Sequence, residues 1–546
     1  MRSRLPQRLL HRIPVRVRHY WKLLAVCAAF LVACAVVFST VRVAPLVISA
    51  SDNDGDEIVE DIVGTADLFD ETKAHTIQLT FRDADYQRLL DEFWQEGEKE
   101  FLEADITIDG TRVDSVGIRL KGNSTLAGLT RNGQSRPGGF GPGGQRGGQG
   151  AGPGGQLPQR DGNAGFPGGG FPGAGNPQGG NPQGGGLRPG GGGFGMASLK
   201  AEEPETLPWL IRFDEFADGR RYQGHREIAV RVAGFGGGST VLNEAVSLNV
   251  LAKAGQTAQR YAYTSFTVNE RPTTARLIVE HPDEHFAESL GDSGVLYKSL
   301  ATGSFTDQGD DPTAYADDFK QITKKGSQDL QPVIDLIKWV NSASDAEFDK
   351  HLADHVDVAS FARYVSAQNL LLNADDMAGP GRNYYLWYDL KTKKFSVVGW
   401  DYNLSFSGSA TTGPHETTSM GGGRFPGGGN GGDFQPPAGM QLPDGMQPPA
   451  GMGGGMGGRG MGGNKLKERF LASKAFTATY DDAYRTLYKK IYAGADALNI
   501  LDGITKVLGT VQGNNAEKTK SDAETLRGLI AQRTEHLAGD TVITGG

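Results

Sequence analysis

The stretch that decides the reading of this chain begins Asn373-Ala374-Asp375-Asp376-Met377-Ala378-Gly379-Pro380-Gly381-Arg382-Asn383-Tyr384-Tyr385-Leu386-Trp387-Tyr388-Asp389 and, after a short turn, ends Phe395-Ser396-Val397-Val398-Gly399-Trp400-Asp401. It opens with two carboxylates and an amide. It continues as two segments of alternating polarity around the turn 390–394, and it closes on a further carboxylate. This pattern predicts a polar loop, a β-hairpin and an aspartate at the end of its second strand.

The order acid, amide, hairpin, acid suits phosphoryl transfer. In protein kinases one Asp accepts the proton of the substrate hydroxyl, an Asn a few residues later holds a metal ion, and a second Asp holds the bridging metal. This chemistry depends mostly on positioning and on charge neutralisation. Acidic residues at a loop and a strand end are also common as solvated caps, so this window alone leaves both interpretations open.

Four pieces of the chain together resemble the spore-coat protein H (CotH) kinase family. They are Gly117–Thr125, Ile278–Asp283, Leu296-Tyr297-Lys298 and the opening stretch, with its Asn-x-Asp and Trp-Asp. The resemblance runs from about residue 68 to 537, outside two Gly-rich blocks. It implies a bilobal, protein-kinase-like fold that transfers the γ-phosphate of ATP to a protein hydroxyl, with Mg²⁺ or Mn²⁺ as cofactor.

The resemblance also implies roles for individual residues. Asp375 is the expected base, with Asp376 as the alternative, and Asn383 and Asp401 are the expected metal ligands. The loop from Asp375 to Asn383 is two or three residues longer than usual in kinases, because Gly379-Pro380-Gly381 is inserted.

The nucleotide site is expected in the β-rich part of the chain. The turn after Gly117 covers phosphate, strand 209–213 supplies a cation, the next helix supplies its carboxylate partner, and a hinge binds adenine. Similar proteins carry a lysine near the start of that strand, whereas here Arg212 is its only cation. The expected nucleotide-binding residues are Lys121, Asn123, Ser124, Arg212, Glu244 (the partner of Arg212), Glu280 (the hinge) and Lys298.

Composition excludes several classes of protein. The chain has 546 residues with 80 glycines, a net charge of −9 and only two cysteines. This mild charge does not indicate a nucleic-acid binder. Both cysteines, Cys27 and Cys34, lie in the apolar N-terminal run, so the folded part has no disulfide framework and no Cys-based metal site.

The N-terminus predicts a membrane anchor. Residues 1–22 are basic, and residues 23–40 are apolar and uncharged. As a helix, residues 23–40 span roughly 27 Å, about one hydrocarbon core. The basic flank predicts a cytoplasmic N-terminus with the bulk of the chain outside. A cleaved signal peptide and a lipoprotein attached through Cys34 are the alternatives.

The remaining organisation is α+β, with a β-rich first half and a helical second half. After a linker (41–66), the kinase-like domain comprises 67–133, 197–406 and 465–546. It is interrupted by two low-complexity insertions, 134–196 and 407–464, which composition predicts to be disordered. Strands are expected at 75–81, 101–109, 111–121, 209–213, 228–232, 262–268 and 274–280, with helices at 85–95 and 241–253. From 282 to 372 the chain is expected to be mainly helical, as it is at 481–492 and 523–537.

Three functions compete at this stage. The first is a membrane-anchored kinase acting on a protein substrate at the cell surface or envelope. The second is a catalytically weak or inactive module that serves surface or coat assembly, which the missing strand lysine favours. The third is a metal-dependent hydrolase using the same carboxylates.

Overall fold

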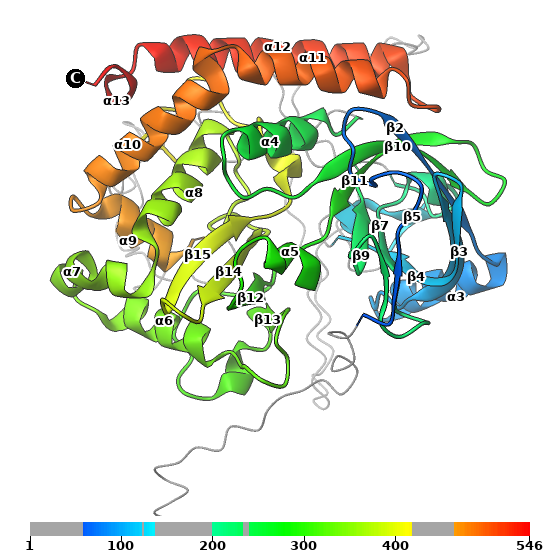
Figure 1. Ribbon diagram of the computed structural model, residues 1–546, viewed down its shortest axis with the longest axis horizontal. Helices are drawn as coiled ribbons and strands as arrows, with labels where there is room; N and C mark the ends of the chain where they lie inside the picture. The colour runs from blue at the N-terminus through cyan, green and yellow to red at the C-terminus, as the bar shows by residue number, and fades with distance from the viewer. Residues whose placement is uncertain (1–57, 123–124, 137–198, 233–239, 418–462, 546) are drawn as a thin grey trace, which may run out of the picture.

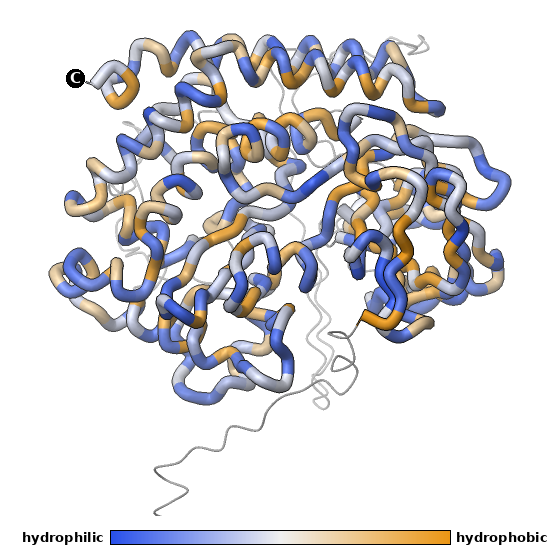
Figure 2. The backbone as a smooth tube through the Cα atoms, in the orientation of Figure 1, coloured by the Kyte–Doolittle hydropathy of each residue, from blue (hydrophilic) through white to orange (hydrophobic). Residues whose placement is uncertain are grey.

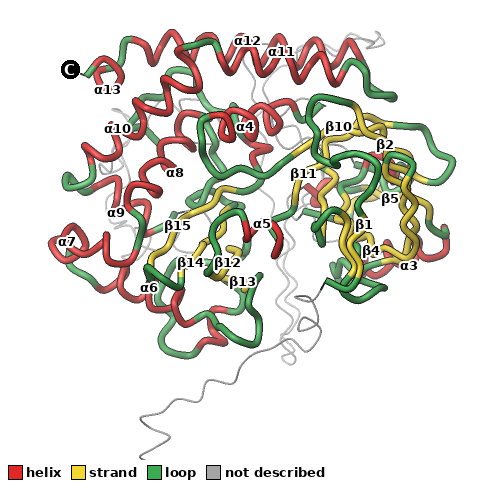
Figure 3. Tube along the Cα trace, in the orientation of Figure 1, coloured by secondary structure: helices red, strands yellow, loops and turns green. Residues whose placement is uncertain are grey.

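The computed structural model describes residues 58–122, 125–136, 199–232, 240–417 and 463–545. The fold is α+β. Strands gather in the N-terminal half of the described chain, and helices dominate the C-terminal half (Figure 1; Figure 3). The expected fold class is confirmed at this level.

The N-terminal half is a closed barrel with the strand order β10-β11-β9-β7-β4-β3-β2. Parallel pairing of β10 with β2 closes it, so these strands have no free edge. The barrel strands are β2 (Ala74–Thr80), β3 (Leu102–Ile108), β4 (Thr111–Leu120), β7 (Trp209–Arg212), β9 (Glu227–Val230), β10 (Tyr261–Val268) and β11 (Thr274–Glu280).

The predicted hairpin at the start of the barrel is confirmed. Asp109 and Gly110 both have positive φ (47° and 84°) and join β3 to β4, as a tight hairpin turn requires. Helix α3 (Asp83–Gln95) covers this end of the barrel and buries Tyr86 and Phe93, two of the residues predicted to form its apolar face. In Figure 2, hydrophobic stretches lie along the barrel strands and α4, and hydrophilic stretches lie on the outer loops.

A second sheet, in the order β13-β12-β14-β15, lies in the C-terminal half. The hairpin of β14 (Tyr384–Asp389) and β15 (Lys394–Gly399) was predicted. The other two strands of the sheet, β12 (Gly294–Ser299) and β13 (Phe319–Gln321), were not predicted. They fall in the part of the chain expected to be mainly helical, and that prediction was wrong there. β12 is buried on both faces and so has no two-residue period; its pairing with the distant β14 decides its conformation.

Helices surround this sheet, and α4 lies near the top of the view, beneath α11 and α12 (Figure 1). Long-range packing of α11 on α4 ties the C-terminal helices to the middle of the chain. The helices are α4 (Leu242–Lys253), α5 (Glu284–Glu288), α6 (Gln331–Ser342), α7 (Asp345–His355), α8 (Val358–Leu370), α9 (Lys465–Ala472), α10 (Thr477–Tyr488), α11 (Asp496–Leu508), α12 (Ala516–Ala538) and α13 (Thr541–Thr544). The sequence interpretation missed α9 and α11.

The expected anchor, 23–40, lies outside the described residues. Within the described ranges, no helix combines the length and apolarity needed to cross a bilayer. The predicted insertions 134–196 and 407–464 also lie mostly outside. Their described ends are part of the fold: residues 134–135 form strand β6 (Gln134–Ser135), and carbonyl groups of 410–416 accept hydrogen bonds from buried side chains.

Candidate active site

Residues 373–383, the loop expected to be catalytic and called the catalytic loop below, follow soon after the end of α8. Asn373 turns the chain there. Its Nδ2 donates to Gln368 Oε1 (2.8 Å), and its Oδ1 accepts from the backbone N of Asp375 (3.2 Å). The asparagine of the Asn-x-Asp pattern therefore holds Asp375 in place through an Asx turn.

Asp375 is enclosed by its own loop. Its Oδ1 accepts from the backbone N of Gly381, and its Oδ2 accepts from Asn383 Nδ2 (2.9 Å). A Cβ on Gly379 would lie 2.4 Å from Asp375 Cα, and one on Gly381 would lie 2.5 Å from Asp375 Oδ2. The three-residue insertion thus wraps around Asp375, and glycine is required there for close approach.

Burial sets the protonation behaviour of Asp375. Its side chain lies in the interior, and this desolvation raises its pKa to about 6. Hydrogen bonding from Gly381 opposes the shift, whereas the charges of Asp401 and Asp376 add to it. A carboxyl with such a pKa is ionised at neutral pH and remains basic enough to take a proton.

Asp376 is held by a different part of the chain. It forms a buried ion pair with Lys467 of α9, and its Oδ1 accepts from the backbone N of Ala378 (2.8 Å). The two adjacent carboxylates therefore have separate partners.

Asp401 follows β15 and Trp400 with a left-handed backbone (φ 58°). Its carboxylate pairs with Arg231, whose Nε also donates to Glu244 Oε2 of α4 (2.8 Å). Burial alone would lower the pKa of Arg231, but Asp401 and Glu244 together raise it. Arg231 therefore couples α4 to the end of the hairpin.

This arrangement corrects the pairing expected for Arg212. Arg212 pairs with Asp214 (2.7 Å) and Glu215 (3.1 Å), in the loop after its own strand, and does not contact Glu244. The cation beside Glu244 is Arg231, just past β9. Arg231 lies inside the predicted strand 228–232, but the resemblance to the family predicted the cation on strand 209–213.

Lys121 and Lys298 flank Trp400 between the barrel and the second sheet. Their Nζ atoms lie 5.1 Å and 5.9 Å from its ring centroid, and Lys298 Nζ is 5.6 Å from the Tyr385 ring. Neither amino group is ion-paired to a carboxylate in the described part of the chain. Burial lowers the pKa of Lys298 to about 8 and lowers that of Lys121 well below its usual range, helped in the latter by the charges of Lys298 and Arg231.

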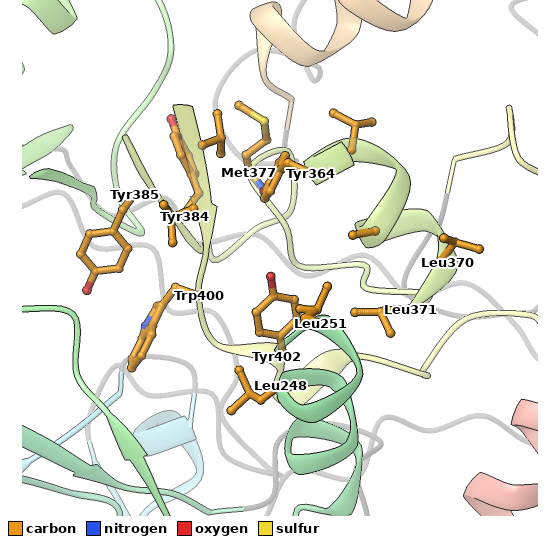
Figure 4. Close-up of a cluster of buried hydrophobic side chains, with 14 of the residues drawn as sticks. Leu248, Leu251, Tyr364, Leu370, Leu371, Met377, Tyr384, Tyr385, Trp400 and Tyr402 are labelled. Carbon is orange, nitrogen blue, oxygen red and sulfur yellow. The ribbon is translucent and has the colours of Figure 1, made fainter. Parts of the chain in front are cut away.

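Apolar packing fixes the surroundings of these charges. Figure 4 shows Trp400 and Tyr385 next to a cluster that includes Leu248 and Leu251 of α4 and Tyr402 after Asp401. The rings of Tyr385 and Trp400 meet edge to face, 6.2 Å apart. Close packing of this kind restricts the movement of the charged side chains beside it.

The remaining predicted residues lie elsewhere. Glu280 ends β11 and accepts a hydrogen bond from the backbone N of Arg260 (3.0 Å). Its neighbour His281 instead contacts Trp400 (5.2 Å between rings) and lies 3.0 Å from Glu227 Oε2. Asn123 and Ser124 lie outside the described residues.

Asp401, Asn383 and Asp375 offer hard oxygen ligands of the type that Mg²⁺ takes. Among the described residues, no group of three or more His, Cys, Asp and Glu side chains is arranged to hold a metal on its own. Mg²⁺ commonly takes one or two protein carboxylates and fills its other positions with water or phosphate oxygens, so a metal ion at Asn383 and Asp401 stays a prediction.

Comparison with known proteins agrees with these features. The family model described as CotH kinase protein matches residues 198–535. The chain belongs to the CotH kinase family. It is also 23% identical over 197 residues to the inner spore coat protein H of Bacillus subtilis (strain 168), a match covering 35% of this chain and 53% of that protein. The chain thus spans about half the length of this curated relative.

Sequence reasoning found the acidic residues of the site but missed Arg231, His281 and Lys467. Arg231 had a usable signal, because a buried arginine in a strand needs a carboxylate, and Glu244 follows on the next helix. Lys467 had none, since it lies beyond a Gly-rich insertion and only the tertiary fold brings it to Asp376.

Proposed function

We propose that this CotH-family chain is a metal-dependent phosphotransferase that moves the γ-phosphate of ATP to a protein hydroxyl. In this proposal the barrel and the helical half act as the two lobes of a kinase-like enzyme, with the nucleotide between them. Family membership supports a kinase-type activity. The nucleotide, the metal and the acceptor are parts of the proposal.

The observation that carries the proposal is the pair Lys121 and Lys298. Burial is the main reason that the pKa values of these two amino groups are depressed, and the charges of Lys298 and Arg231 lower that of Lys121 further. A bound polyanion would relieve the cost of charging these amino groups. A triphosphate matches this demand, because both lysines lie beside Trp400, the residue before Asp401, and Asp401 and Asn383 could share a cation with the same phosphates.

Roles for the other residues follow from their contacts. Asp375 accepts the proton of the acceptor hydroxyl, with Asp376 as the alternative. Arg231 fixes Asp401 relative to α4 through Glu244. Asp401 and Asn383 would hold Mg²⁺ or Mn²⁺, which would supply charge neutralisation on the phosphates.

Location is also part of the proposal. The similar Bacillus subtilis protein is named as an inner spore coat protein, which supports a coat or surface setting here. The basic-flanked apolar segment 23–40 supports attachment to a membrane with the bulk of the chain extracytoplasmic. The protein substrate would then belong to the surface or envelope.

Thermal melting of the full chain with ATP, Mg²⁺, and both together tests nucleotide binding. We expect a rise of several degrees with ATP and Mg²⁺ together and little with Mg²⁺ alone, because a ligand stabilises the state that binds it. Lys121→Met and Lys298→Met should abolish the rise, whereas Lys350→Met, at an exposed position of α7, should keep it. No rise in the wild-type protein would favour an inactive assembly module instead.

A further inference from the structure

The strands β4, β7 and β9 lie side by side in the barrel, and their outer face carries several cations. Ile118 and Leu120 of β4 belong to the barrel core, so the residues that alternate with them, Arg119 and Lys121, point out of the barrel. The backbone N of Lys121 donates to Pro208 O (3.0 Å), so the pairing of β4 with the chain at β7 continues through Lys121. The side chains of Arg119 and Lys121 therefore lie on one face, two positions apart.

Two other cations on this face already have carboxylate partners. Arg212 of β7 pairs with two carboxylates of the loop after its strand, and Arg231, just past β9, pairs with Glu244 and Asp401. Arg119 differs from both. Among the described residues it forms no ion pair, and its buried Nε atom has no hydrogen-bond partner. A half-buried guanidinium is thus left with donors that nothing in this part of the chain accepts.

An aromatic ring holds the guanidinium of Arg119 in place. Its Cζ lies 5.1 Å from the centroid of the Phe101 ring, and Arg212 Cζ lies 5.8 Å from the same centroid. A cation–π contact attracts the charge but accepts none of the five N–H groups of a guanidinium. The contact with Phe101 therefore positions Arg119 and leaves its donors for another acceptor.

Further cations lie close to Arg119. In the loop between α3 and β3, burial lowers the pKa of Lys99 to about 8, helped by the charges of Arg119 and Lys298. The charge of Arg119 also contributes to the depressed pKa values of Lys298 and Lys121. Glu227 is the carboxylate that opposes the shifts at Arg119 and Lys298. Positive charge therefore continues from the two lysines beside Trp400 to Arg119 and the loop before β3.

We propose that Arg119 is a third cation for the polyphosphate chain of the nucleotide, donating two hydrogen bonds from its planar guanidinium to oxygens of one phosphate; the identity of this polyanion rests on the proposed function. A partly desolvated guanidinium without acceptors costs free energy in the empty protein, and a phosphate supplies the acceptors that this face lacks. Lys121 and Lys298 act as point charges, whereas the fork of Arg119 fixes the orientation of the phosphate that it binds.

The spacing of these cations favours a polyphosphate over an acidic segment of the acceptor protein. Two positions along a strand place the backbones of Arg119 and Lys121 roughly 7 Å apart, with both side chains on the same face. Lys298 lies on the other side of Trp400's neighbourhood, within 5.9 Å of the same ring that Lys121 contacts. A triphosphate carries its charges on adjacent groups of one short chain, so a single ligand can reach all three cations.

Isothermal titration calorimetry of the full chain with inorganic tripolyphosphate, with ATP and Mg²⁺, and with poly-glutamate measures this site. We expect Arg119→Met to raise the dissociation constants of the first two ligands about tenfold or more, because it removes charge-assisted hydrogen bonds but keeps an apolar side chain over Phe101. Arg119→Lys should recover part of the affinity, since it keeps the charge without the fork. Arg112→Met, at an exposed position near the other end of β4, is the matched control and should bind like the wild-type chain.

The possible outcomes separate this inference from the proposed function. If Arg119→Met binds tripolyphosphate and ATP as tightly as the wild-type chain, or weakens only the binding of poly-glutamate, the inference is overturned, while ATP binding by the wild-type chain still upholds the proposed function. If the wild-type chain binds tripolyphosphate through Arg119 but does not bind ATP with Mg²⁺, the proposed function fails and the phosphate-binding role of Arg119 stands. If the wild-type chain binds neither ligand, both fail.

Discussion

At the scale of single residues, Asp375 carries the most specific expectation. Its pKa, raised to about 6 by burial, makes it protonated below that value and ionised above it. A base must be ionised, so kcat should rise with pH through about 6 and level off above about 7. Steady-state assays with saturating ATP and Mg²⁺ from pH 5 to 8 measure this, and a flat profile would argue against Asp375 as base.

The same shift has a consequence for stability. A carboxyl whose folded pKa lies above its unfolded value favours the protonated fold, so this contribution is present at low pH and is lost as the pH rises through about 6. Keeping Asp375 ionised at neutral pH therefore lowers the stability of the fold, a pattern that is common at functional sites.

Arg231 and Arg212 form a matched pair for testing the corrected ion pair. Arg231→Met leaves Glu244, which is fully buried, without its cation, and loss of one partner of a buried pair costs roughly 3–5 kcal/mol. Arg212→Met should cost about 1 kcal/mol or less, because Asp214 keeps Arg221 and Arg226 as partners. Urea unfolding measures both, and equal losses would contradict the assignment of Arg231.

The acidic loop and the hairpin of the candidate site were predictable from sequence, because each depends on the order of residues within one short window. The Asn-x-Asp, the hairpin and the closing Asp401 lie within that window, and the structure brings Asp375, Asn383 and Asp401 to one region. The partners of these residues could not be predicted from the local sequence. Arg231 reaches Asp401 across 170 positions of sequence, a relation set by the packing of the barrel against the second sheet rather than by spacing.

At the scale of elements, the segment after Asp401 depends on α12. Arg533, on that helix, is fully buried and donates to the carbonyl groups of Ala410, Thr412 and Asn369. Its Nη2 also donates to Asn369 Oδ1 (2.9 Å) and to the hydroxyl of Tyr484 (3.1 Å). One side chain therefore fixes the described residues ahead of 418 to α8 and α10.

Replacing Arg533 should destabilise the protein measurably. Arg533→Met leaves several buried acceptors without a donor, which should lower the free energy of unfolding by roughly 2–4 kcal/mol. Arg527→Met on the same helix is the control, since Arg527 is exposed and its pair with Asp502 should be worth under about 1 kcal/mol. Chemical denaturation compares the two, and similar small effects would show that Arg533 is not an anchor.

Strands were predicted correctly where buried and exposed residues alternate, and they were missed where both faces of the strand are buried. β2 alternates between exposed and buried positions, and its strand was predicted. β12 is almost continuously buried, and its region was taken as helical. For such a segment only the partner strand distinguishes the two conformations.

At the scale of the whole molecule, the candidate site depends on both halves of the chain at once. The barrel contributes Lys121 and Arg231, α4 contributes Glu244, and the second sheet with its loops contributes Lys298, Asp375 and Asp401. Figure 1 shows α4 and the segment from β11 to α5 spanning the region between the halves. The charges meet only when the barrel and the sheet are packed together, which local sequence does not encode.

The central claim is that this chain transfers phosphate through Asp401. The most direct measurement is transfer of radiolabelled γ-phosphate from ATP to protein by the full chain and by Asp401→Asn, with melting temperature recorded alongside. We predict incorporation by the wild-type chain that requires a divalent metal and falls by about two orders of magnitude or more in Asp401→Asn, because the variant removes the charge that would hold the metal. The variant's melting temperature should fall only slightly, since Arg231 keeps Glu244 as its partner. Equal incorporation by Asp401→Asn and the wild-type chain, or none by either, would contradict the account.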